Sequence, residues 1–473
     1  MVFGSPDQDQ SFKRPDPLRG FKNYNGGYNV TDKHYLASAV FTGVHSYAIA
    51  GVWLLCGLGF GIVFTWKILR RSDSSHVKDY LNHHYLLMFL IIILFTLLAI
   101  IATSLVLAAN ESAFYRTNKF MRTIVEVGKD THRKIHKVII AMIEMQHLLR
   151  PYDPATSVRF YTITHLLARE AQAIRDIVQK SGRAIDLAIH TSHILHLVVV
   201  TINLVLLLTS LVLLLLHWHP GFITIIFVCW ILTTICWALT GFDFFLQTFV
   251  YDTCTAFQDF EQDPQNCSLS SMIPCMDSSS SDQLLIEIGS TIHNFVSKLN
   301  WKMEELYVLL PSEGNIMDLV GVKKICDPFS GPPNYTYIPE SCSKDSISIQ
   351  DIPNILSRLT CYQDNSPETC TREGKIIPES ISNMALAYSR SVQNMLSIYP
   401  DLESLARCIV VKTAFSDVVK HQCKSFKASI RMLWSSMFSL SVFMMILVLI
   451  WVAKAYQERG RCFSRCSIVP DRP

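Results

Sequence analysis

Five long apolar segments divide the sequence into a close pair, a second close pair and a single fifth segment. They cover residues 47–69, 85–109, 195–216, 222–249 and 432–453. A helix needs about 20 mostly apolar residues to cross the roughly 30 Å hydrocarbon core of a bilayer, and each segment is long enough. The pattern therefore predicts an all-α, polytopic membrane protein with five transmembrane helices.

The segment 110–194, between the second and third spans, has a helical pattern on both sides of a proline pair. Apolar residues recur at steps of three and four up to Leu149, as on one face of a helix. Pro151 and Pro154 are expected to break this helix. The periodicity resumes at Val158 and runs into the third span, which predicts a helical hairpin whose arms continue spans two and three.

The segment 250–431 is more mixed in composition. A stretch rich in Cys, Pro and Ser reaches residue 281, a helix is predicted over 282–310, and a proline-containing loop region follows. A second helical stretch begins at 379, is expected to break near Pro400, and leads into the fifth span. Alternating strand patterns are short and isolated, so this region is predicted to be mainly helical and disulfide-containing.

Charges flanking the spans predict the orientation, because short basic segments stay cytoplasmic. Basic residues follow the first span (Lys67, Arg70, Arg71, Lys78) and the fifth (Lys454, Arg459, Arg461, Arg465). Segments 1–46, 110–194 and 250–431 are then external, and 70–84, 217–221 and 454–473 are cytoplasmic. Four further cations just before the fifth span nearly balance the tail: Lys420, Lys424, Lys427 and Arg431.

Glycosylation signals give an independent indication of the same orientation. The N-x-[ST] sequons start at Asn29, Asn110, Asn266 and Asn334, and all four fall on the predicted external side. Asn110 lies at the membrane surface, where a glycosylating enzyme has poor access, so it is interpreted as a chance match. The candidate acceptors are therefore Asn29, Asn266 and Asn334.

Cysteines concentrate in the second external region. Nine of the 14 lie there: Cys254, Cys267, Cys275, Cys326, Cys342, Cys361, Cys370, Cys408 and Cys423. Their density predicts disulfides formed in the secretory pathway, with Cys267–Cys275 and Cys361–Cys370 as candidate small loops. The irregular spacing without C-x-x-C pairs disfavours a zinc site, so no metal or other cofactor is expected.

The two ends of the chain carry weaker signals. Cys462 and Cys466 lie among arginines on the predicted cytoplasmic tail, where they are candidates for palmitoylation or are simply solvated thiols. Residues 1–31 are polar and lack the apolar core of a signal peptide. Two expectations follow: the first span itself starts translocation, or a cleaved signal precedes this start.

Asp243 is the main candidate for chemistry inside the membrane, because a carboxylate within a span is costly and usually faces protein or water. It could contact a pore or a ligand, but a structural cap or pair is the favoured interpretation. His190, His193 and His196 approach the third span at steps of three, which spreads them around the helix. They are interpreted as interfacial histidines.

Composition excludes several classes of function. The chain is 50% hydrophobic and 17% charged, with a mean hydropathy of +0.26, which is too apolar for a typical soluble enzyme. A net charge of +3 from dispersed basic residues argues against nucleic-acid binding. The sequence contains no G-x-S-x-G, P-loop or H-E-x-x-H motif, so no enzymatic activity is predicted.

The order of spans and loops resembles the tweety family and the related five-span prominins. From about residue 35 to 461 it shares the paired spans, the helical external loop and the large cysteine-bearing region before a final span. It is most similar to the plant branch, described as plasma membrane fusion proteins. The resemblance implies a plasma-membrane protein without enzymatic activity, associated with anion conductance or lipid handling in animal tweety members and with membrane shape or fusion elsewhere.

These observations favour a non-enzymatic plasma-membrane protein that organises the membrane, or binds lipid or a partner, through its helical ectodomain. A tweety-like anion channel or transporter is the first alternative, and a cell-surface receptor or adhesion protein is the second. Membrane lipids are the expected partners. The pattern leaves open whether the protein forms a homo-oligomer.

Overall fold

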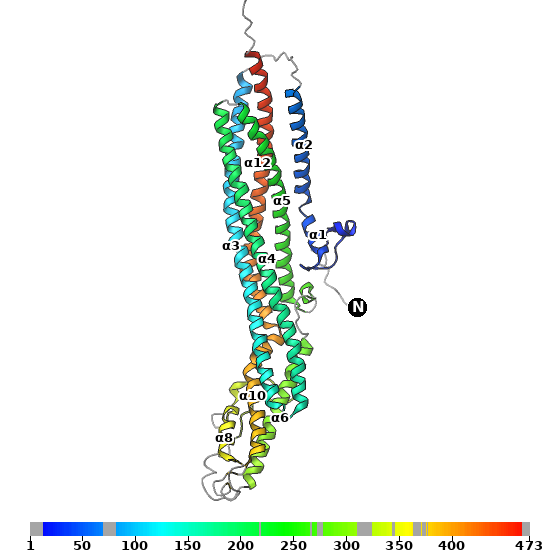
Figure 1. Cartoon of the computed structure of the whole chain (residues 1–473), viewed down its shortest axis with the longest axis vertical. Coiled ribbons are helices and arrows are strands. Elements are labelled where there is room, and N and C mark those ends of the chain that lie inside the picture. The colour runs from blue at the N-terminus through cyan, green and yellow to red at the C-terminus, as the bar shows by residue number, and fades with distance from the viewer. Residues whose placement is uncertain are drawn as a thin grey trace, which may run out of the picture. The chain divides into compact units, whose positions relative to one another are not determined.

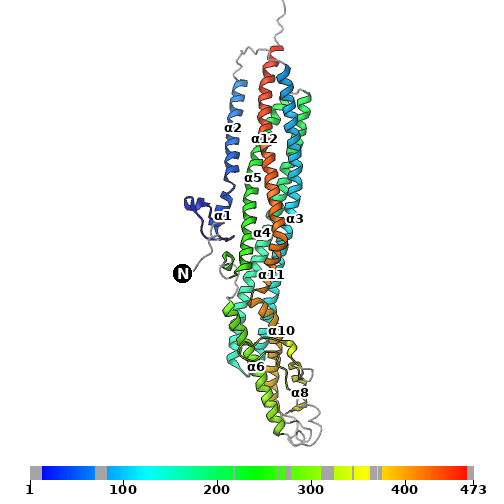
Figure 2. The same ribbon diagram turned by 180° about the vertical axis from the view of Figure 1, so that it is seen from behind.

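The computed structural model describes residues 13–69, 82–216, 219–264, 267–271, 278–309, 324–342, 346–362, 370, 375 and 377–465. Figures 1 and 2 show the chain from opposite sides. It divides into two compact units. Unit 1 takes in 1–123, 182–273 and 415–473, and unit 2 takes in 124–181 and 274–414.

Helices account for most of the described structure, which confirms the predicted fold class. They are α1 Lys33–Phe41, α2 Val44–Leu69, α3 Asn82–Leu149, α4 Pro154–Leu216, α5 His219–Gln262, α6 Ser278–Leu309, α8 Ile352–Leu359, α10 Glu379–Ala406, α11 Ile409–Asp417 and α12 Lys424–Arg465. Short 3₁₀ turns are η1 Pro17–Arg19, η2 Ser268–Ser271, η3 Pro339–Ser341 and η4 Ile349–Asp351, and η5 Val418–Cys423 is a π-helix. Strands β1 Pro15–Asp16 and β2 Lys22–Asn23 pair antiparallel, and β3 Thr360–Cys361 and β4 Ile377–Pro378 pair parallel.

Five of these helices are long and apolar enough to cross a membrane: α2, α3, α4, α5 and α12. Each of them contains one of the five predicted segments. The protein is therefore a polytopic membrane protein with five candidate spans.

The predicted helical hairpin is present, and its break has a clear local cause. Helix α3 ends at Leu149 and α4 begins at Pro154, the residue type that fits the first helical position. The Asp153 side chain accepts hydrogen bonds from the Thr156 backbone N–H at 3.1 Å and from the Thr156 hydroxyl at 2.7 Å. These bonds cap the helix and hold the pKa of Asp153 below its ordinary value.

The expected break near Pro400 is wrong. Helix α10 continues through Pro400 to Ala406, because Ile398, Tyr399 and Leu402 on either side of the proline are buried in unit 2. The helix ends at Ala406 instead, Arg407 is its C-cap, and Cys408 has a positive φ of 50°. Packing on both sides thus outweighs the backbone hydrogen bond that a proline removes.

Helix α5 also extends further than the sequence pattern indicates. The fourth apolar segment ends at 249, but α5 continues to Gln262. Val250, Cys254 and Phe257 remain buried on this extension, at steps of three and four. The helical face that packs within the span therefore continues beyond it.

In unit 1, α2 packs beside α5, as Figure 2 shows. The Trp53 and Trp230 rings are stacked with centroids 4.4 Å apart, and the Trp230 indole N–H donates to the Trp53 carbonyl at 2.8 Å. A Cβ atom at Gly57 would lie 2.3 Å from Trp230 Nε1. The glycine is needed here because only its bare backbone lets the indole approach.

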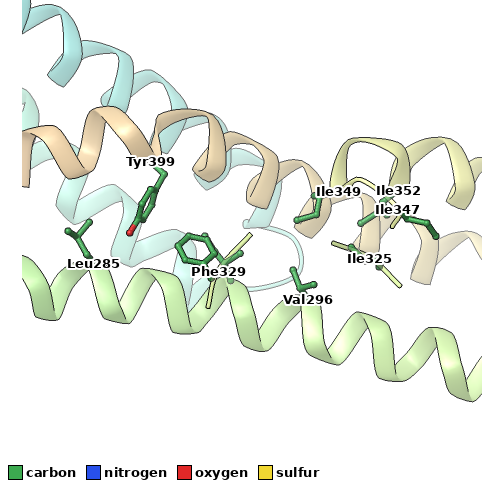
Figure 3. Packing of buried hydrophobic residues seen from close by; sticks show 9 residues of the cluster. Leu285, Val296, Ile325, Phe329, Ile347, Ile349, Ile352 and Tyr399 are labelled. Carbon is green, nitrogen blue, oxygen red and sulfur yellow. The ribbon is translucent and has the colours of Figure 1, made fainter. Parts of the chain in front are cut away.

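Unit 2 has its own hydrophobic core, in which α6 packs against residues of the segment 325–352 and against Tyr399 of α10. Figure 3 shows Tyr399 of α10 directed towards Leu285 and Phe329, and Val296 of α6 close to Ile325. A second cluster joins α3 to α10; its buried members are Val138, Ala141, Met142, Met145, Ile398 and Leu402. Unit 2 can therefore be stabilised by burial of apolar surface without lipid.

Disulfides crosslink residues within each unit. Cys254 of α5 is bonded to Cys423 of η5 in unit 1, while Cys326–Cys342 and Cys361–Cys370 lie in unit 2. Cys408 is disulfide-bonded as well. The suggested Cys361–Cys370 loop is confirmed, but Cys267 carries a free thiol, which differs from its suggested pairing with Cys275. Cys275 lies outside the described residues.

Replacing Cys254 by serine should destabilise unit 1. The Cys254–Cys423 bond closes a loop with a sequence separation of 169 residues. Its loss increases the conformational entropy of the unfolded chain, which is expected to lower the free energy of unfolding by about 2–4 kcal/mol. Thermal unfolding of the detergent-purified protein should show a lower midpoint. Cys267→Ser is the matched control and should leave the midpoint unchanged; equal midpoints for both variants would contradict this role of the bond.

Candidate functional site: a buried histidine–aspartate pair between two spans

A histidine of α4 and an aspartate of α5 face each other inside unit 1. His196 Nε2 lies 3.0 Å from Asp243 Oδ1 and 3.2 Å from Oδ2. The two side chains are only 1% and 0% exposed. Because both residues lie within candidate spans, the pair connects two candidate transmembrane helices.

The hydrogen bonds of His196 define where its protons are. Nδ1 lies 2.8 Å from the carbonyl oxygen of Ser192, one turn earlier on α4. A carbonyl can only accept, so Nδ1 carries a proton. Nε2 then either donates to the Asp243 carboxylate as part of an imidazolium, or accepts from a protonated carboxyl group.

Both proton arrangements give the pair a net charge of zero. A bare carboxylate within a bilayer is costly, and a neutral or mutually compensated pair lowers that cost. Asp243 thus has the structural partner that was favoured from sequence. The histidine that supplies it, however, had been interpreted as an interfacial residue.

His190 and His193, which also approach the third span, lie away from this pair. His193 stacks on Phe114 of α3 with ring centroids 4.3 Å apart, and its Nε2 lies 3.4 Å from Glu111. The side chain of His190 is about half exposed. The step of three residues therefore separates these side chains, as the helical geometry predicts.

Asn203 is a second buried polar residue on the same face of α4. It lies two helical turns from His196 and is fully buried, and neither its amide nitrogen nor its oxygen hydrogen-bonds within the described part of the chain. An unpaired buried amide is costly. By contrast, the hydroxyls of Thr233 and Thr240 donate to carbonyls one turn back on α5.

A separate polar cluster, around Asp252, connects the N-terminal segment to α5. Asp252 accepts hydrogen bonds from Arg14 and from the Tyr35 hydroxyl, the latter at 2.9 Å. The Tyr28 hydroxyl lies 3.0 Å from the Thr253 hydroxyl, and burial raises the pKa of Tyr28 to about 12. Tyr28 therefore stays protonated. Sequence reasoning missed this cluster because its members are more than 200 residues apart.

The candidate glycosylation sites differ in accessibility. Asn334 is exposed, and Asn29 is half-buried with its Oδ1 accepting from the Thr31 backbone N–H at 3.0 Å. Asn110 is 4% exposed, and its Nδ2, the atom that would carry a glycan, donates to the His193 carbonyl at 3.1 Å. This geometry disfavours glycosylation of Asn110. Asn266 lies outside the described residues.

Metal and lipid-attachment chemistry have less structural support. Among the residues that the structure describes, no three His, Cys, Asp or Glu side chains come together to form a metal site. Cys462 lies in α12, but its side chain is not described, and Cys466 lies outside the described residues. Palmitoylation at these two cysteines stays a prediction.

Removing the His196 side chain should destabilise the protein. His196→Ala leaves the buried Asp243 carboxyl without its partner, which is expected to cost about 3–5 kcal/mol. Asp243→Asn should cost less, because the amide can still donate to Nε2. Thermal unfolding in detergent measures both effects. His190→Ala is the matched control, and a similar loss in that variant would contradict a specific role of the pair.

A comparison with known protein families and with curated protein sequences finds no match to this chain. The resemblance to the tweety family therefore stays a prediction from the order of spans and loops. The function has to be inferred from the geometry of the two units and from the polar groups inside the spans.

Proposed function

We propose that this protein is a non-enzymatic plasma-membrane protein that organises the membrane, or binds lipid or a partner, through the helical region outside the bilayer. The observation that carries the proposal is the length of α3 and α4, which have 68 and 63 residues. A span uses about 20 residues, so each helix continues for roughly 40 residues beyond it.

The region beyond the spans is folded in its own right, which supports an interaction role. Unit 2 contains two hydrophobic clusters, and the Cys326–Cys342 and Cys361–Cys370 disulfides lie in it. Lys137 of α3 and Asp401 of α10 form an ion pair at 2.7 Å. A rigid surface of this kind can bind a lipid headgroup or a protein partner without a large ordering cost.

The orientation is part of the proposal: the N-terminus and unit 2 are external, and the C-terminal tail is cytoplasmic. The basic residues after spans one and five and the positions of the sequons support it. The disulfides are consistent with a membrane of the secretory pathway.

Several buried polar groups of the spans favour packing over conduction. Thr96 and Thr103 of α3 donate to carbonyls one turn back in their own helix, and the Thr240 and Ser441 hydroxyls lie 3.0 Å apart. His196 and Asp243 compensate each other. These groups are engaged within the protein, whereas a conducting path needs polar groups that face water.

Reconstitution into liposomes tests the proposed function. The purified protein should retain phospholipid or change vesicle shape or clustering, and it should give no ion flux above that of empty vesicles. A protein-dependent flux without retained lipid or remodelling would overturn the proposal.

An ion channel or transporter is the second candidate function, and Asn203 is the observation that favours it. Its unpaired amide lies on the same helical face as His196, where a permeating ion or water could bind. If liposomes do show flux, Asp243→Asn and Asn203→Leu should each reduce it at least tenfold. Flux that both variants leave unchanged would exclude this face of α4 as the path.

Glycan mapping tests the proposed orientation. Asn334→Gln should remove one glycan from protein made in a eukaryotic secretory system, seen as a mobility shift that glycosidase treatment abolishes. Asn110→Gln, its matched control, should leave the glycan mass unchanged because Asn110 is buried. A cytoplasmic location of Asn334, shown by reaction of an introduced cysteine only after permeabilisation, would contradict the orientation.

A further inference from the structure

One face of η5 and α12 changes from basic to aromatic where the fifth apolar segment begins. Its members follow steps of four and three: Lys420, Lys424, Lys427, Arg431, Trp434 and Phe438. Such steps place side chains on one side of a helix. The four cations precede residue 432, and the two aromatic residues lie within the span.

Helix α5 borders this face along its length. The Lys427 ammonium lies 4.2 Å from the centre of the Tyr251 ring, and Lys420 Nζ lies 3.3 Å from Glu261 Oε1. Deeper in the span, Trp434 contacts Phe244 with ring centroids 5.3 Å apart. Phe438 then contacts Trp237 at 5.7 Å. All these residues belong to unit 1.

The face is accessible at both its basic and its aromatic end. Tyr251 is 54% exposed and Phe438 is 41% exposed. Lys424 and Arg431 are exposed, and neither forms an ion pair within the part of the chain that the structure describes. Two unpaired cations and a tyrosine thus stand directly above an apolar, aromatic surface.

We infer that this α5/α12 face binds one phospholipid, with the phosphate on Lys424 and Arg431 and an acyl chain along Trp434 and Phe438. Arginine recognises phosphate oxygens through two parallel N–H bonds, and a neighbouring lysine ammonium attracts the same phosphate as a second positive charge. Exposed tyrosines are common at the headgroup level. The inference rests on the proposed function and names its lipid class and site.

The charge distribution favours a lipid over a second copy of the chain as the occupant. A two-fold contact through this face would bring Lys424 and Arg431 of each copy close to the same residues of the other. Like charges in such a contact repel each other. A phosphodiester headgroup has the opposite charge and matches the order of polar and apolar groups along the helix.

Lipid titration of the full-length protein in a neutral detergent, followed by native mass spectrometry, tests the site. The probes are dioleoylphosphatidylglycerol, dioleoylglycerol with the same chains but no phosphate, and inorganic phosphate. The phospholipid should bind at least tenfold more tightly than dioleoylglycerol, and inorganic phosphate should not compete with it. Lys424→Gln with Arg431→Gln should weaken phospholipid binding about tenfold and leave dioleoylglycerol binding unchanged.

Matched variants keep the test specific. Lys119→Gln with Arg122→Gln removes the same charge from exposed positions on α3 and should change affinity less than twofold. Lys424→Arg with Arg431→Lys keeps the charges and should retain most of the binding, while melting temperatures report folding. Phe438→Ala should weaken the binding of both lipids.

Several outcomes would overturn the inference. The first is equal affinity for the two lipids, and the second is an equal loss of phospholipid affinity in the Lys424→Gln/Arg431→Gln and Lys119→Gln/Arg122→Gln variants. The others are competition by inorganic phosphate and crosslinking of a cysteine introduced at position 424 to a second copy of the chain. If wild-type protein binds phospholipid but Lys424→Gln with Arg431→Gln does not weaken it, the site is wrong and the proposed function stands. If the wild-type protein binds neither lipid, the lipid-binding part of the proposed function fails too.

Discussion

The constraint on which the rest of the structure depends is that backbone N–H and C=O groups inside a bilayer must be hydrogen-bonded within the protein. Helices satisfy these backbone groups, and the described part of the chain contains five helices long enough to cross. Buried hydroxyls such as those of Thr96 and Thr240 bond back to their own helices. The buried pair of His196 and Asp243 has no net charge, and it also connects α4 to α5.

Where the spans end, the forces that hold the chain together change. The Cys254–Cys423 bond joins the extended part of α5 to η5, and Asp252 fixes the N-terminal segment through Arg14 and Tyr35. Unit 2 relies on apolar burial and its own disulfides. The hydrophobic driving force between helices is weak in lipid and strong in water, so a core of this kind is more strongly stabilised in water.

Sequence patterns predicted the features that depend on local composition. The five spans, the break between Leu149 and Pro154 and the helix over most of 282–310 are all present. Features that depend on distant partners were not predictable. Pro400 stays helical because of its buried neighbours, and the Asp252 cluster joins residues more than 200 positions apart. The pairing of His196 with Asp243 likewise requires knowing that α4 and α5 are neighbours.

A weak signal for that pair did exist in the sequence. An acidic residue within a span predicts a partner, and the third span contains few polar residues besides His196 and Asn203. Antiparallel adjacent spans place the outer end of one beside the outer end of the next. Together these points could have singled out His196, but spacing along one helix cannot show which side chains meet across two.

An experimental structure in a lipid nanodisc, at a resolution that shows ordered water, tests the central claim most directly. The account predicts direct contact between His196 and Asp243, no continuous file of water through the five spans, and a phospholipid along the α5/α12 face. A continuous water-filled path past Asn203 and Asp243, open to both sides of the membrane, would contradict it.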